Sequence, residues 1–300
     1  GVSAVFYAYI GFDAVSTLAE ESKNPKKDIP RSMIYSLVIC TVVYIILALV
    51  MTGMTSYKLL GVSDPLAEIF KIKGIKWMLF IVSLTAVIAM TSVLLVYQMG
   101  QPRIWMSMSR DGLLPKKFSS IHPKFKTPGF ATIVTGLVVG IPIFFTDENI
   151  VLDFTSIGTL FAFALVCGGI LMLPRNDDTE TRGRFRMPYV NSKYIAPAAT
   201  IVGFLIIAIF FPDSVYEHSD KGSLHYPMII FYIVWAVIAV LSFFRSFSLI
   251  PVIGLLSCCY LLTGMRWTNW AMFGAWLVIG LTIYFFYGRK RSKLAGNPQP

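Results

Sequence analysis

Long apolar runs alternate with short polar connections along the whole chain. A helix that spans a bilayer needs about 20 predominantly apolar residues, so this pattern predicts nine transmembrane spans. The longest connection, 101–128, has 28 residues, and no stretch is typical of a soluble domain. The spans are expected at about 1–19, 32–52, 77–100, 129–146, 152–174, 194–212, 226–244, 246–264 and 267–287.

The composition agrees with a membrane protein. Hydrophobic residues make up 56% of the 300 residues and charged residues 14%, whereas soluble proteins have roughly 25% charged residues. Too little polar surface is present to coat a water-soluble globule, which excludes a soluble enzyme, a disordered tail and a disulfide-rich secreted domain. The net charge of +10 comes from basic residues between the apolar runs, which favours membrane topology over nucleic-acid binding.

The distribution of Lys and Arg indicates an orientation. Of the 26 basic residues, 20 lie in connections 20–31, 101–128 and 175–193, at Arg245 and in the tail, and 6 lie in the alternate connections. Because cytoplasmic loops collect basic residues, the C-terminus is expected inside and residue 1 outside. A chain that starts outside with neither Met nor a signal is hard to insert, so we expect upstream spans to be missing.

The first span, GVSAVFYAYIGFDAVSTLAEES, is interrupted at Gly11-Phe12-Asp13. Glycine permits non-helical backbone and aspartate is a preferred helix N-cap, which predicts two half-helices. Such a break is tolerated in a membrane where the backbone lines a cavity or is buried in protein, and its free carbonyls can hold an ammonium group. We take Asp13 to be the only acidic residue inside a span, which favours function because intramembrane carboxylates are costly. The alternative is a packing glycine and a simple cap.

Two long motifs then carry a resemblance to a known family. FYAYIGFDAVSTLAEESKNPKKDIP, residues 6–30, resembles the sixth-helix signature of the amino acid–polyamine–organocation transporters, and within them it is most similar to the cationic amino acid transporter branch. RIWMSMSRDGLLPKKFSSIHPKFKTPG, residues 103–129, resembles that branch's loop between helices eight and nine. The nine spans match helices six to fourteen of a fourteen-helix member, so the resemblance covers the whole chain.

The resemblance implies a fold of two inverted five-helix repeats. Residues 1–174 are then the second repeat, whose first helix is discontinuous, and residues 175–300 are four additional C-terminal helices with a basic cytoplasmic tail. The N-terminal repeat of the same protein, which completes the substrate site in this family, is missing from the chain as given.

The resemblance also assigns the substrate site to the broken first span. Backbone carbonyls at Tyr7, Ala8 and Ile10 are expected to receive the substrate ammonium group, and Gly11 gives the backbone room. Tyr7 holds the place of an aromatic gate. Asp13 is expected to cap the second half-helix, with a role in proton movement as a further hypothesis.

Two other groups of residues have open interpretations. Met90 and Thr91, in the span that resembles helix eight, either line the side-chain pocket or serve helix packing, which membrane helices achieve with small hydroxyl residues. Met90 would narrow a pocket and disfavour a long cationic side chain. Arg103, Arg110 and Asp111 form either an inner-gate network or, as the residues alone favour, an anchor with a local ion pair.

The sequence predicts an all-α polytopic membrane protein. The resemblance implies that it works as an amino acid permease in the plasma (inner) membrane, by secondary transport coupled to protons. No cofactor, metal or nucleic-acid partner is expected. The alternative is a truncated remnant or subunit that transports nothing. A membrane-embedded enzyme is disfavoured, because no metal-ligand set or nucleophile–base pair accompanies Asp13.

Overall fold

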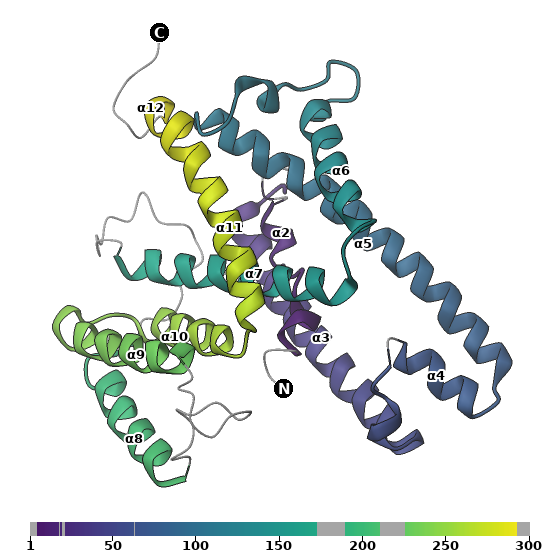
Figure 1. The fold of residues 1–300 in the computed structure, drawn as a ribbon, viewed down its shortest axis with the longest axis horizontal. Helices are drawn as coiled ribbons and strands as arrows, with labels where there is room; N and C mark the ends of the chain where they lie inside the picture. The colour runs from purple at the N-terminus through teal and green to yellow at the C-terminus, as the bar shows by residue number, and fades with distance from the viewer. Residues whose placement is uncertain are drawn as a thin grey trace. The chain divides into compact units, whose positions relative to one another are not determined.

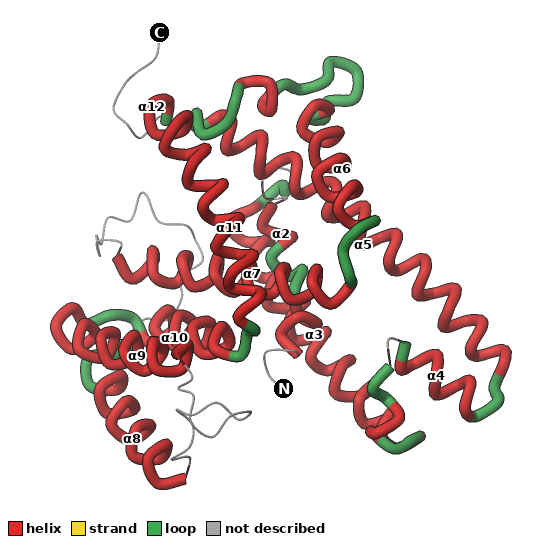
Figure 2. Tube along the Cα trace, viewed as in Figure 1, coloured by secondary structure: helices red, strands yellow, loops and turns green. Residues whose placement is uncertain are grey.

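A computed structural model describes residues 5–17, 19, 22–62, 64–172, 190–210 and 226–292. Apart from one isolated bridge between Asn191 and Ser248, these residues form helices and loops (Figures 1 and 2). The elements are η1 (Tyr7–Tyr9), α2 (Ala14–Thr17), α3 (Pro25–Met54), η3 (Tyr57–Leu59), α4 (Pro65–Ile72), α5 (Lys76–Arg110), η4 (Lys116–Ser119), α6 (Gly129–Ile143), α7 (Glu148–Met172), α8 (Ile195–Phe210), α9 (Tyr226–Arg245), α10 (Leu249–Thr263), α11 (Trp267–Ile283), the π-helical turn η6 (Tyr284–Gly288) and α12 (Arg289–Arg291).

Every predicted span after the first contains one apolar helix, long or short. Within the described residues, five helices are long and apolar enough to cross a membrane: Pro25–Met54, Lys76–Arg110, Asn149–Met172, Tyr226–Arg245 and Trp267–Gly288. Three shorter apolar helices are Gly129–Ile143, Ile195–Ile206 and Leu249–Thr263. Large apolar side chains face outward along these helices, as Leu49 does with 68% of its surface exposed. The chain is an all-α polytopic membrane protein, as the sequence predicted.

Helices α3 and α5 extend well beyond their predicted spans, and each has a proline in the added part. Helix α3 begins at Pro25, because proline at the first helical position loses no hydrogen bond. Helix α5 continues through Gly100 and Pro102 to Arg110, beyond the predicted end at residue 100. Pro102 removes one intrahelical hydrogen bond, but the residues on both sides keep the helical conformation.

The chain divides into two compact units. One consists of Gly1–Ile10 with Thr146–Ile279, and the other of Gly11–Phe145 with Gly280–Pro300. This division follows packing and is of a different kind from the two regions expected at 1–174 and 175–300, which stay a prediction. The chain passes from one unit to the other at Ile10–Gly11, inside the interrupted first span.

In the first unit, α7 packs along α10 around two apolar clusters. Ile157, Leu160 and Leu262 form the buried centre of one cluster, and Phe6 packs against it. The ring of Phe6 also meets that of Phe163 edge to face, with centroids 6.3 Å apart. The start of the chain is therefore held against α7 by aromatic packing.

In the second unit, α5 is the element that α2, α4, α6 and η4 contact. Phe118 of η4 packs edge to face against Trp105 at 5.4 Å and Phe130 at 5.1 Å, measured between ring centroids. Gly112 follows the end of α5 with φ +83° and lies against the backbone of Arg291. The basic connection after α5 and the basic tail therefore meet within this unit.

Candidate functional site at the interrupted first span

The helix of the first span stops between two short helical turns. Helix η1 ends at Tyr9, where Ile10 adopts an extended conformation with ψ 130°. Gly11 then has φ +122°, a conformation that residues with a Cβ atom rarely adopt. Helix α2 restarts at Ala14. The interruption predicted at Gly11-Phe12-Asp13 is confirmed.

Asp13 holds this turn together through both its side chain and its backbone. Its Oδ1 atom accepts a hydrogen bond from the Gly11 backbone N–H at 3.2 Å. Its main-chain carbonyl accepts bonds from Ser16, from the backbone N–H at 2.8 Å and from the hydroxyl at 2.6 Å. The carboxylate thus bonds to the residue two positions before it. A carboxylate bond to the first N–H groups of α2, which the predicted cap requires, stays a prediction.

The carbonyls before the break differ in what they bind. The Tyr7 carbonyl accepts the backbone N–H of Ile10 at 3.1 Å, which uses one of its two lone pairs. No hydrogen bond within the described part of the chain uses the carbonyls of Ala8 or Ile10. Helical carbonyls normally have an intrahelical partner, so these two are acceptors that the break sets free.

Helix α5 lies directly against the second half of the first span. A Cβ atom at Gly11 would lie 3.2 Å from the Tyr97 hydroxyl, and a Cβ atom at Gly100 would lie 2.8 Å from Thr17 Oγ1. Close approach through small residues is how membrane helices pack tightly. The break is therefore fixed against a long, continuous helix one turn before Pro102.

Met90 and Thr91 lie farther along the same helix. Met90 is seven residues before Tyr97, which is two helical turns and about 10 Å, so both share one face of α5. Its side chain is 63% exposed in this chain. The Thr91 hydroxyl donates to the Val87 carbonyl of its own helix at 2.8 Å. Met90 thus lies on the same face of α5 as Tyr97, which meets Gly11. A role of Met90 and Thr91 in substrate binding stays a prediction.

The predicted inner-gate residues lie together at the C-terminal end of α5. Arg103 is half-buried, whereas Arg110 and Asp111 are exposed. The Arg110 guanidinium reaches Met106 Sδ at 3.7 Å, and the Asp111 backbone N–H ends the helix by bonding to Ser107. They precede the contact between Gly112 and Arg291 along the chain. Both predicted roles of these residues, as an inner gate and as a membrane anchor, stay predictions.

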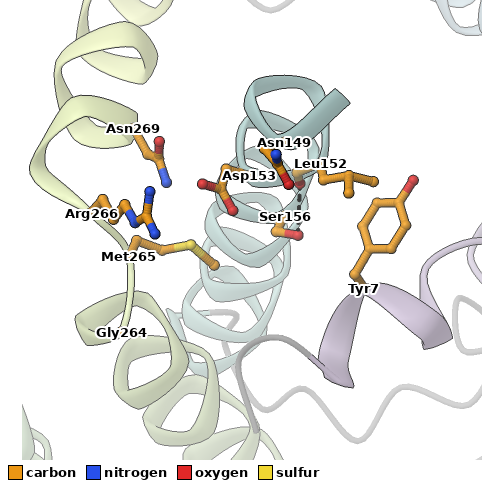
Figure 3. Close-up of a pocket in the computed structure, with 9 residues that line it drawn as sticks. All are labelled: Tyr7, Asn149, Leu152, Asp153, Ser156, Gly264, Met265, Arg266 and Asn269. Atoms are coloured by element: carbon orange, nitrogen blue, oxygen red, sulfur yellow. Dashed lines mark hydrogen bonds between the residues drawn. The ribbon is translucent and has the colours of Figure 1, made fainter. Parts of the chain in front are cut away.

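A polar cavity of about 440 Å³ adjoins Tyr7, and the sequence analysis missed it (Figure 3). The prediction that Asp13 is the only acidic residue inside a span is wrong, because Asp153 lies within 152–174 and in helix α7. Asp153 faces this cavity together with Arg266, from the turn between α10 and α11. The signal was present in the cluster of Asp147, Asn149 and Asp153 at the start of α7.

Comparison with known proteins identifies the family. A family model described as "Amino acid permease" matches residues 1–238. The chain belongs to the amino acid permease family. A model for the C-terminus of this family matches residues 248–292, and the resemblance to the amino acid–polyamine–organocation transporters is confirmed.

Individual relatives cover almost the whole chain. The branched-chain amino acid permease BcaP of Bacillus subtilis is 32% identical over 97% of the chain and 50% of its own length. The methylthioribose transporter of the same organism is 31% identical over 97% of the chain and 51% of its own length. The mitochondrial cationic amino acid transporter 3 of Arabidopsis thaliana is 29% identical over 98% of the chain and 58% of its own length. The chain therefore spans between half and three fifths of the length of these relatives.

Proposed function

We propose that the protein moves amino acids across a membrane by secondary transport, with the substrate held at the break in the first span. The substrate ammonium group binds the carbonyls of Ala8 and Ile10, and Gly11 provides the turn that exposes them. The observation that carries this proposal is the pair of unused carbonyls beside a glycine at φ +122°. An ammonium group has three donors, so it is a suitable ligand for carbonyls that a helix break leaves without an intrahelical partner.

We expect transport to require a protein about as long as the relatives, with an N-terminal repeat in addition to this chain. The chain covers 50% of BcaP and 51% of the methylthioribose transporter. From the resemblance of its two motifs to the sixth helix and to the loop between helices eight and nine, we take residues 1–174 as the second of two inverted repeats. The first repeat then supplies the groups that bind the substrate carboxylate. This chain expressed alone is expected to reach the membrane and to transport nothing.

Contacts inside each unit support the predicted orientation. Gly112 meets Arg291 in one unit, and both belong to connections assigned to the cytoplasm. In the other unit, Asn149 and Arg266 line one cavity, and both belong to connections assigned outside. Together with the excess of Lys and Arg in the connections that contain Gly112 and Arg291, this favours a cytoplasmic C-terminus, and we expect the plasma membrane as the location.

The expected substrate has a neutral side chain. Met90 brings an apolar, uncharged side chain to the face of α5 that reaches the break, which disfavours a long cationic group. BcaP is named for branched-chain amino acids, whereas other relatives are named for cationic amino acids or methylthioribose. L-Leucine is thus the first substrate to test, with L-arginine and methylthioribose as competitors.

The test is uptake of tritiated L-leucine by the full-length protein in proteoliposomes. We expect saturable uptake that an inward proton gradient stimulates and that excess L-leucine abolishes more effectively than L-arginine or methylthioribose. Stimulation that disappears in Asp13→Asn, with normal insertion, supports Asp13 in proton coupling. No uptake by a correctly inserted full-length protein, for any of the three compounds, contradicts the proposed function.

A further inference from the structure

The cavity beside Tyr7 has one charge of each sign on its walls. Asp153 comes from the second turn of α7, and Arg266 comes from the turn that joins α10 to α11. Figure 3 shows the two side chains pointing toward one another, with Tyr7 at the opposite edge. Both belong to the described part of the chain, yet they form no direct ion pair. The gap between them leaves room for a ligand that carries both charges.

Neutral hydrogen-bonding groups complete the walls. Asn269 is 3% exposed, and its Oδ1 accepts a long bond from the Thr268 hydroxyl at 3.4 Å. Its side chain lines the cavity, so the amide nitrogen can donate to a ligand there. Asn149 adds a second, exposed amide. These groups can bind further oxygens of a polar ligand.

The size and the chemistry match an amino acid. A volume of about 440 Å³ lies within the range of roughly 300–1,000 Å³ for small-molecule sites. Carboxylate–ammonium and guanidinium–carboxylate contacts are charge-assisted hydrogen bonds, and arginine binds carboxylates with two parallel bonds. A zwitterion placed between Asp153 and Arg266 satisfies both without leaving either charge unpaired.

We propose that this cavity is a second amino acid site, separate from the break, in which Asp153 binds the ammonium group and Arg266 binds the carboxylate. The site is formed by α7 and by the α10–α11 turn, so it gives two of the additional C-terminal helices a role in ligand recognition. It rests on the proposed function only in taking an amino acid as the ligand. Since Arg266 is exposed, solvent screens its contact, and the site binds more weakly than the break.

The test is equilibrium binding of tritiated L-leucine to the full-length protein in nanodiscs. We expect two bound molecules per protein. Asp153→Asn weakens the second site by roughly 10- to 100-fold, as the loss of a charged hydrogen bond predicts. Arg266→Gln weakens it by about fivefold, because solvent screens the exposed guanidinium. The matched control Lys71→Gln removes an exposed basic residue elsewhere and keeps both sites.

Two analogues of leucine test which residue binds the ammonium group and which binds the carboxylate. Leucinol lacks the carboxylate, so Arg266→Gln leaves its binding to the second site unchanged while Asp153→Asn weakens it. Isocaproate lacks the ammonium group and gives the reverse pattern. One bound L-leucine in the wild-type protein, or two that neither substitution affects, overturns the second site.

A further variant separates this proposal from the proposed function. Gly11→Val should remove the site at the break and leave the Asp153–Arg266 site occupied. If Gly11→Val changes nothing while Arg266→Gln removes a site, the second site stands and the assignment of the break fails. If Gly11→Val empties both sites, binding in the cavity depends on the break and the separate site is overturned.

Discussion

Gly11 and Gly100 lie in the same packed unit, but the helix is interrupted at Gly11 and continuous at Gly100. Gly11 interrupts the first span with φ +122°, whereas Gly100 stays inside the 35-residue helix α5, two residues before Pro102. Each is confined by a side chain of the other segment, Gly11 by Tyr97 and Gly100 by Thr17.

Of these two glycines, only the one whose backbone N–H bonds to a nearby carboxylate interrupts its helix. At Gly11 that group is the Asp13 carboxylate, which accepts the Gly11 N–H. Among the described residues no side chain accepts the Gly100 N–H, and the backbone at Gly100 stays helical. The missing side chain of Gly100 instead allows close packing against Thr17. The break is thus a property of the Gly11–Asp13 pair.

The largest expected effect is that of Gly11→Val on uptake. A β-branched residue at positive φ is a genuine outlier, and holding it there costs about 1–3 kcal/mol. We expect uptake of L-leucine to fall on the order of 100-fold while the protein still reaches the membrane. Retained uptake would mean that the break does not position the substrate.

Substitution of Gly100 should instead affect stability first. A Cβ atom 2.8 Å from Thr17 Oγ1 forces a shift, and overpacking costs about 1–3 kcal/mol. We expect Gly100→Ala to lower the thermal stability of the purified protein and Thr17→Ala to restore it in the double variant. Strict additivity of the two substitutions, measured in a double-mutant cycle, is the outcome that contradicts the contact.

Asp13→Ala and Asp13→Asn separate the structural from the transport role of the carboxylate. Alanine removes the acceptor of the Gly11 N–H and should destabilise the protein by about 1.5–3 kcal/mol. Asparagine keeps an oxygen acceptor but cannot ionise, so we expect near-normal stability with loss of proton-stimulated uptake. Normal proton-stimulated uptake in Asp13→Asn leaves Asp13 with a structural role only.

The smallest expected effect concerns Tyr97, and it separates backbone strain from steric contact at Gly11. Tyr97→Phe alone should change uptake less than about threefold, since it removes one hydroxyl beside the break. In Gly11→Ala the added Cβ meets that hydroxyl at 3.2 Å. Because the conformational cost at φ +122° remains, Tyr97→Phe should restore only part of the lost uptake. Full rescue would show that sterics alone require the glycine.

Most of the fold was predictable from the sequence, because bilayer-spanning helices require long apolar runs that are easy to recognise. The boundaries at Pro25 and Arg110 were not, since proline near a helix start and proline within a helix have different consequences. The interrupted first span was predictable from Gly11 and Asp13, whose local preferences agree with the observed turn.

The candidate site was predictable only where it is local in sequence. The break follows from Gly11 and Asp13, and the family resemblance points to the carbonyls of Tyr7, Ala8 and Ile10 beside it. The cavity, in contrast, joins Asp153 to Arg266 across more than 100 residues. Periodicity gives no information about such a pairing. A carboxylate near the end of an apolar run is also easily taken for part of a loop, which is why Asp153 was passed over.

Occupancy of the break by substrate is tested most directly at Ala8, which is exposed in this chain. In the full-length protein with its native cysteines replaced by alanine, Ala8→Cys would be labelled with a methanethiosulfonate reagent. The account predicts that labelling blocks uptake and that saturating L-leucine slows it at least about tenfold, as for a residue in contact with ligand, with no slowing at the loop control Ser56→Cys. Equal labelling rates with and without L-leucine, or normal uptake by the labelled protein, would contradict a substrate site at the break.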